Sequence, residues 1–174
     1  MLILAAFIKR NQRRLRKLND EILCAAAMNF TVTYFNLAIF SYVLSKIVSK
    51  PRFLSGEYES CLHDIELALK KLADSLDVAG EEEILNIFSE IQKAISYLEE
   101  RDPRFVIGLV TKGKLKMAAT LYAQGMSLGI ASEMTGMEKQ EILNYAGETM
   151  MFDRLKDEKG IHERMKFARK LIEE

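Results

Sequence analysis

Tryptophan is absent from this sequence of 174 residues, which contains only two prolines and nine glycines. Proline removes a helical hydrogen bond and glycine weakens a helix, so their scarcity favours long, uninterrupted helices. Cys24 and Cys61 have no CxxC spacing, predict no disulfide framework and are typical of a reducing compartment. Residues 1–8 form a short apolar stretch whose charges follow it instead of preceding it, so no secretory signal is evident and we expect a cytoplasmic protein.

Residues that support catalysis or bind metals are also scarce. Neither histidine, His63 or His162, lies in a motif typical of a catalytic base. On a helix, Cys61 and His63 project about 200° apart and cannot bind one ion, and Cys61 with Asp64 supplies only two ligands. Pairs of carboxylates at 81–83 and 99–100 are typical of solvated helix faces. We therefore expect no enzyme, no cofactor and no metal site.

The net charge is zero, but the charges are unevenly distributed. Residues 1–50 carry 8 basic and 2 acidic side chains, whereas residues 51–111 carry 6 basic and 13 acidic ones. One interpretation is that the two helical segments attract each other, which is favoured because solvated helix faces are normally charged. The other is that the two segments present separate surfaces to different partners.

The hydrophobic pattern predicts an all-α bundle, because no strand-like alternation longer than four residues occurs. An amphipathic helix is expected after Ser55, with apolar residues three or four apart at Leu62, Ile65, Leu69, Leu72 and Leu76. Residues 77–80 break it, and three glutamates open the next helix, where carboxylates meet the positive end of the helix dipole. That second helix buries Ile84, Ile87, Phe88, Ile91, Ile95 and Leu98. A short turn between the two predicts an antiparallel pair.

The uncharged stretch from Ile22 to Leu44 has 23 residues, which is long enough to cross a membrane. Asn29, Thr33 and Asn36 recur at helical spacing within it and would place a polar stripe on one face. Buried amides need hydrogen-bonding partners, which neighbouring helices supply more readily than lipid. The stripe therefore favours one buried bundle helix over a membrane span, and we expect no membrane association.

Three units are expected along the chain. Residues 1–111 form the bundle, which is the expected dimerisation region of a homodimer. Asp102-Pro103 predicts a helix start, and Lys112-Gly113-Lys114 is expected to interrupt the helix that follows. Residues 112–150 form the second unit. Residues 151–174 contain a terminal helix with Met165, Phe167, Ala168, Leu171 and Ile172 at helical spacing, which docks on the bundle or on a partner.

The second unit fits a helix-turn-helix template. Gly125, Gly136 and Gly147 are each expected just past a helical segment, where glycine relieves the strain of the C-cap. Ser127 is placed to cap the second segment. Ser132 falls where a small residue lets two helices cross, Gly136 falls at the turn, and Ile142 falls where an apolar residue packs inward. Other inward positions of the template are Leu115, Ala118, Tyr122, Ala131, Met137 and Tyr145.

Residues 116–150 also resemble a known family. The stretch LYAQG at 121–125, followed by SLGIASEMTGM at 127–137, is similar to the small prokaryotic antitoxin-like helix-turn-helix family, whose members read LY-x-x-G and then SLG-x-AAELAGM. The resemblance implies a role in transcriptional control or in toxin–antitoxin pairs, with a nuclease toxin of the PIN type as partner. Members are short, whereas here a long helical region precedes the motif.

If the unit binds duplex DNA, its third segment is the recognition helix. Lys139, Gln140 and Asn144 would then face the bases, because glutamine and asparagine pair with adenine through two hydrogen bonds. The lysines expected to contact phosphate are Lys112, Lys114 and Lys116, with the basic cluster at 9–17 as a further source. Two glutamates on the same segment and a net charge of +1 over 112–147 oppose this function. A helical scaffold or adaptor protein with no nucleic-acid role is therefore the alternative hypothesis.

Overall fold

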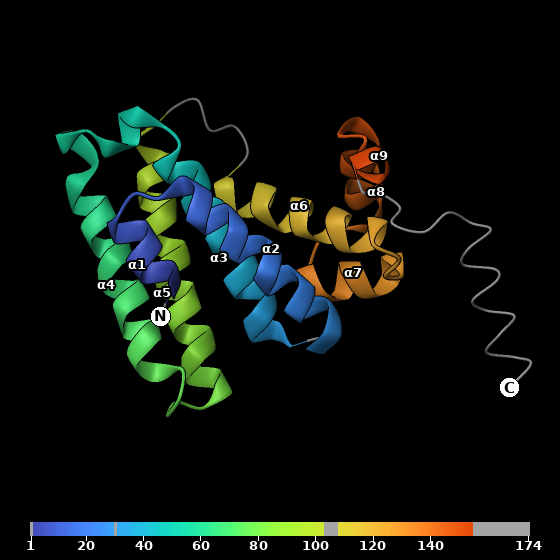
Figure 1. The fold of residues 1–174 in the computed structure, drawn as a ribbon, viewed down its shortest axis with the longest axis horizontal. Coiled ribbons are helices and arrows are strands. Elements are labelled where there is room, and N and C mark those ends of the chain that lie inside the picture. Colours follow the sequence, from blue (N-terminus) through green and yellow to red (C-terminus); the bar gives the residue numbers. More distant parts are fainter. Residues whose placement is uncertain (1, 30, 103–107, 155–174) are drawn as a thin grey trace, which may run out of the picture.

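The computed structural model describes residues 2–29, 31–102 and 108–154, and every regular element among them is a helix (Figure 1). The all-α fold class is confirmed for these residues. The α-helices are α1 (Leu2–Ile8), α2 (Gln12–Asn29), α3 (Val32–Val48), α4 (Glu59–Ser75), α5 (Glu81–Glu100), α6 (Leu109–Ala123), α7 (Leu128–Thr135), α8 (Lys139–Glu148) and α9 (Met151–Arg154). Two short 3₁₀ helices, η1 (Pro51–Leu54) and η2 (Gly56–Tyr58), connect α3 to α4.

The antiparallel pair expected from the sequence is formed by α4 and α5, which lie side by side (Figure 1). Each residue expected to be buried on α5 is buried, as are Leu62, Ile65, Leu69 and Leu72 on α4. Three glutamates stand in the first turn of α5, as the charge pattern predicts. These helices could be located from sequence because each has one apolar stripe at helical spacing.

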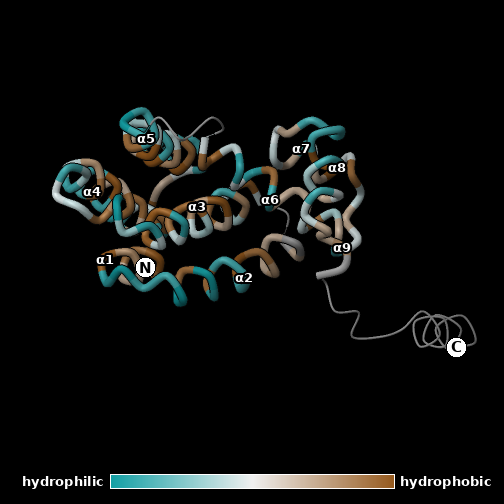
Figure 2. The backbone as a smooth tube through the Cα atoms, turned by 90° about the horizontal axis from the view of Figure 1, so that it is seen from above, coloured by the Kyte–Doolittle hydropathy of each residue, from teal (hydrophilic) through white to brown (hydrophobic). Residues whose placement is uncertain are grey.

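Helix α3 is the centre of the main core. Ten of its 17 residues are buried, and α1, α2, α5 and α6 all pack against it (Figure 2). A helix that is apolar nearly all round is stable only when other helices cover it, which is what the surrounding helices do.

The expectation of one helix over 22–44 is wrong, because the segment forms the end of α2 and the start of α3. Thr31 begins α3 as its N-cap, with its side-chain oxygen accepting a hydrogen bond from the Tyr34 N–H. The predicted polar stripe is lost at this turn, and the side chain of Asn29 lies outside the described residues. Asn36 instead donates to the Val32 carbonyl within its own helix. In the part of the chain that the structure describes, no helix is long and apolar enough to cross a membrane.

Asn19 makes the polar contact that joins α2, α3 and α6. It is 3% exposed, and its Nδ2 donates to the Ala38 carbonyl oxygen at 2.7 Å and lies 3.3 Å from Ser41 Oγ and 3.6 Å from Met117 Sδ. A buried amide is stable only when it is hydrogen-bonded, so this contact favours one relative placement of the three helices.

Gly113 lies where α6 approaches α3. The expected interruption at 112–114 is wrong, because α6 continues through it from Leu109 to Ala123 and spans the expected boundary between residues 111 and 112. A Cβ atom on Gly113 would lie 2.9 Å from Val43 Cγ2 and 3.3 Å from Ile39 Cγ2. The glycine therefore permits close packing and does not end a helix. The expected helix start at Pro103 and the terminal helix after residue 154, with His162, lie outside the described residues.

Gly113 and Gly147 form a matched pair for mutation. Gly147 was expected to end a helix, but it lies inside α8, whose C-cap is Thr149, and a Cβ there meets nothing within 4 Å. Gly147→Ala should raise the free energy of unfolding by about 0.5 kcal/mol through helix propensity. Gly113→Ala should lower it by about 1 kcal/mol, because overpacking against the stiff Val43 side chain outweighs the same gain.

Urea unfolding followed by circular dichroism measures both changes. A Gly113→Ala protein as stable as the Gly147→Ala protein would contradict the steric role of Gly113.

Candidate functional site

Helix α7 begins and ends as the sequence predicts. Ser127 caps α7, with its hydroxyl oxygen accepting from the Ile130 N–H. Gly136 ends α7 with φ +67°, in the left-handed region that favours glycine. Ser132 was expected to allow close crossing, and its hydroxyl in addition donates to the Met137 carbonyl oxygen at 2.7 Å. This hydrogen bond fixes the turn between the two helices.

A second, smaller core holds α6, α7 and α8 together. Ile142 is fully buried, as predicted, and it packs with Ala131 and Ala146 against Ala118 and Ala119 of α6. The small side chains of α6 allow α8 to approach closely. Figure 1 shows α7 running across the view beside α6, with α8 and α9 standing at the far end of α6 from α5.

Two of the residues predicted to read bases, Gln140 and Asn144, lie on the side of α8 opposite the buried Ile142, and Lys139 lies in the first turn. Lys139, Gln140 and Asn144 are all exposed. Gln140 Nε2 donates to Asn144 Oδ1 at 2.9 Å, so one amide orients the other across a helical turn. Two groups of this pair remain for other partners. The Gln140 side-chain carbonyl oxygen can accept a hydrogen bond, and the Asn144 side-chain N–H groups can donate one.

The two glutamates that oppose DNA binding have a structural role. Glu138 is the N-cap of α8, and Glu141 accepts from the Glu138 N–H to complete a capping box. These carboxylates satisfy N–H groups that would otherwise be free to bind an anion at this helix end. Any phosphate contact therefore has to come from other parts of the surface.

The three lysines predicted to contact phosphate do not share one face. Lys112 and Lys116 are one helical turn apart, whereas Lys114 projects about 200° from Lys112 around α6. Lys116 Nζ lies 4.2 Å from the centroid of the Tyr42 ring, and Lys46 Nζ lies 5.3 Å from the same ring. Two cations from two helices thus contact one aromatic side chain on α3.

Further cations adjoin this pair. Burial lowers the pKa of Lys46, and the nearby charge of Arg16 on α2 lowers it further. Burial also lowers the pKa of Lys50, with Arg52, Lys112 and Lys46 contributing and Asp102 opposing. We call five residues the basic strip: Arg16 on α2, Lys46 on α3, Lys50 just after α3, and Lys112 and Lys116 on α6.

Sequence reasoning missed Lys46 and Lys50 of the basic strip. Lys46 and Lys50 are isolated lysines at the end of an apolar segment, and only their four-residue spacing indicates a shared face. Within the basic cluster at 9–17, Arg10 forms an ion pair with Glu66 at 3.0 Å, and Arg14 and Lys17 lie 3.9 Å from Glu21. In that cluster, Arg16 has a charge that lowers the pKa of Lys46 and opposes the rise in the pKa of Tyr42.

Carboxylates near the basic strip are found at its two ends. Glu99 on α5 accepts a hydrogen bond from the Leu109 N–H and so caps α6 from another helix. Burial raises the pKa of Glu99, while this hydrogen bond and Lys112 act in the opposite direction. Asp102, 1% exposed, pairs with Arg52 at 2.7 Å. Asp20 is exposed on α2, one turn beyond Arg16 at the other end.

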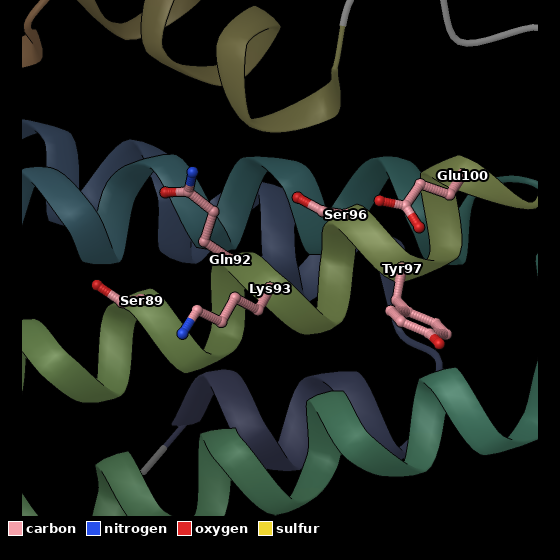
Figure 3. Close-up of a pocket in the computed structure, with 6 residues that line it drawn as sticks. All are labelled: Ser89, Gln92, Lys93, Ser96, Tyr97 and Glu100. Carbon is pink, nitrogen blue, oxygen red and sulfur yellow. The ribbon is translucent and has the colours of Figure 1, made fainter.

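A hollow of about 560 Å³ along α5 contains no converging catalytic groups. The described residues that line it all belong to this one helix, and their side chains project in different directions (Figure 3). They are Ser89, Gln92, Lys93, Ser96, Tyr97 and Glu100. Their spacing is that of a solvated helix face. Among the described residues there is no group of three histidine, cysteine or carboxylate side chains able to bind a metal.

Comparison with known proteins adds no relative. No protein-family model, curated protein or solved structure matches this chain. The outward face of α8 and the basic strip are the two polar surfaces that bear on function.

Tyr42 offers a spectroscopic test of the basic strip. Burial raises the pKa of Tyr42 from 10.0 to about 12, with Tyr145 adding to the rise and Arg16 opposing it. A folded-state pKa above the unfolded value stabilises the protein below pH 10, and this contribution is lost as the pH rises towards 12.

Phenolate absorbance followed against pH should show a component near pH 12 that is missing in Tyr42→Phe. The unfolding free energy of the wild type should also fall more steeply than that of Tyr42→Phe between pH 10 and 12. If Tyr42→Phe instead lost a component near pH 10, Tyr42 would not be buried between these helices.

Proposed function

We propose that this chain is a helical regulatory protein whose α7–turn–α8 segment is a DNA-binding helix-turn-helix, with α8 as the recognition helix. The observation that carries the proposal is the arrangement of α8. Its inward residue Ile142 is fully buried, while Gln140 and Asn144 are exposed on the opposite side and Lys139 is exposed in the first turn. A recognition helix needs this combination, because it must be held rigidly by its own core while its polar side chains reach base edges.

The chemistry of the outward face supports base recognition. The hydrogen-bonded Gln140–Asn144 pair presents an acceptor and donors, which match the adenine N6 amino group and N7 acceptor in the major groove. Lys139 adds a cation at the same helix end. The resemblance to antitoxin-like proteins is consistent with this proposal and extends it to a second partner, a nuclease toxin, which would bind elsewhere on the same chain.

An adaptor protein without a nucleic-acid role is the second candidate. A shallow groove of about 290 Å³ on α1, α2 and α3 favours it, because its lining is mostly apolar. Its side chains include Leu2, Leu18, Ile22, Tyr34, Leu37 and Leu76. Leu2 is 60% exposed, so apolar surface remains open to solvent there.

The outward face of α8 is tested with a matched pair of triple variants. Duplexes that bind the wild type are first selected from a random-sequence library. Lys139→Ala/Gln140→Ala/Asn144→Ala should then lose at least tenfold in preference for the selected duplex over mixed-sequence duplex, since a bidentate base contact contributes about 1–3 kcal/mol of discrimination. The control, Asn86→Ala/Gln92→Ala/Lys93→Ala, removes the same three residue types from exposed positions on α5 and should keep the preference.

Fluorescence anisotropy measures both preferences, and circular dichroism checks that each variant is folded. A folded α8 variant with unchanged sequence preference would exclude α8 as the recognition helix. If the wild type binds no duplex even at low salt, the adaptor hypothesis replaces the regulator.

A further inference from the structure

We propose that the basic strip on α2, α3 and α6 binds the phosphodiester backbone of duplex DNA, so that the DNA footprint extends from α8 onto the N-terminal bundle. The inference rests on the proposed function and deepens it, because it names the surface that supplies affinity. It also assigns a role to residues that lie far outside the helix-turn-helix in the sequence.

Cations from three helices converge on one surface of the protein. Lys46 and Lys116 contact the same Tyr42 ring at 5.3 and 4.2 Å. Arg16 and Lys112 lie close enough to Lys46 and Lys50, respectively, for their charges to act on them. Figures 1 and 2 show α2, α3 and α6 adjoining one another between the α4–α5 pair and the α7–α9 end of the molecule. A chain of zero net charge therefore concentrates positive charge on one surface.

Holding these cations together costs free energy in the unbound protein. Like charges held near each other on a partly buried surface repel, and here burial adds a desolvation cost for Lys46 and Lys50. A bound polyanion relieves the repulsion, and release of its counterions makes binding favourable. Arg16 and Lys112 are exposed, so phosphate groups can reach both ends of the strip.

The basic strip is continuous with the proposed recognition helix. Helix α8 packs on α6, which carries Lys112 and Lys116, and Tyr145 of α8 contributes to the raised pKa of Tyr42. Backbone N–H groups at the N-terminus of α8 are occupied by its own Glu138 and Glu141, so these groups cannot supply the phosphate contacts. Contacts to the backbone position a protein on DNA while base contacts specify the sequence, and the strip and α8 would divide these roles.

The test compares the salt dependence of binding in the wild type, two variants that lack charges and one variant that restores them. Arg16→Gln/Lys112→Gln removes two exposed charges of the basic strip, and Lys70→Gln/Lys93→Gln removes two exposed charges from α4 and α5 as a control. Binding to mixed-sequence duplex is measured by fluorescence anisotropy from low to moderate salt. Each lost phosphate contact should lower the slope of log affinity against log salt by about 0.9.

The strip variant should therefore lose nearly two units of slope, while the control keeps the slope of the wild type. Between 50 and 200 mM salt, the affinity of the strip variant should fall about tenfold less than that of the wild type. Restoring the charges as Arg16→Lys/Lys112→Arg should restore the slope. Vesicles containing phosphatidylserine form a second arm, because their phosphate groups offer the same charge without a duplex.

Each contrary result has its own meaning. If the wild type binds duplex and the strip variant keeps its slope, the basic strip is not the phosphate surface, although the recognition helix stands. If the slope falls but the α8 triple variant keeps its sequence preference, the strip is supported and the recognition helix is wrong. Binding to vesicles without binding to duplex would overturn both.

Discussion

The close packing of α6 on α3 is the contact on which the rest of the structure depends. Gly113 allows it, since a Cβ atom there would lie 2.9 Å from Val43 Cγ2. Asn19 reinforces it from α2 by hydrogen bonding to α3 beside Met117 of α6. Through this contact, one face of α6 joins the main core with Met117 and Leu121, while Ala118 and Ala119 belong to the smaller core.

The same contact brings together charges that are distant in the sequence. Arg16, Lys46 and Lys112 belong to three helices, and each is unremarkable in its own helix. Because α6 packs on α3, Lys116 contacts the Tyr42 ring and the charge of Lys112 lowers the pKa of Lys50. The even overall charge balance hides this surface, because the acidic side chains concentrate on residues 51–111. Charge distribution in space, not net charge, is what bears on polyanion binding.

The helices could be predicted from sequence where a single apolar stripe recurs at helical spacing, as on α4 and α5. The ends of α7 could also be predicted from its capping residues, since Ser127 and Gly136 begin and end this helix as expected. The prediction failed at glycines, because a glycine can either end a helix or allow two helices to approach closely. Gly113 was expected to interrupt a helix, but it allows two helices to approach, and Gly147 lies within α8. Composition alone cannot distinguish a glycine that ends a helix from one that permits close packing.

The sequence by itself determined the all-helical class, the α4–α5 pair and the outward placement of Gln140 and Asn144, because helical periodicity is a local property. Only the tertiary structure decided that the apolar stretch at 22–44 divides at Thr31, and that Lys116 joins Lys46 at the Tyr42 ring. These features depend on how helices pack, and packing is set by contacts between residues such as Asn19 and Met117, which are 98 positions apart.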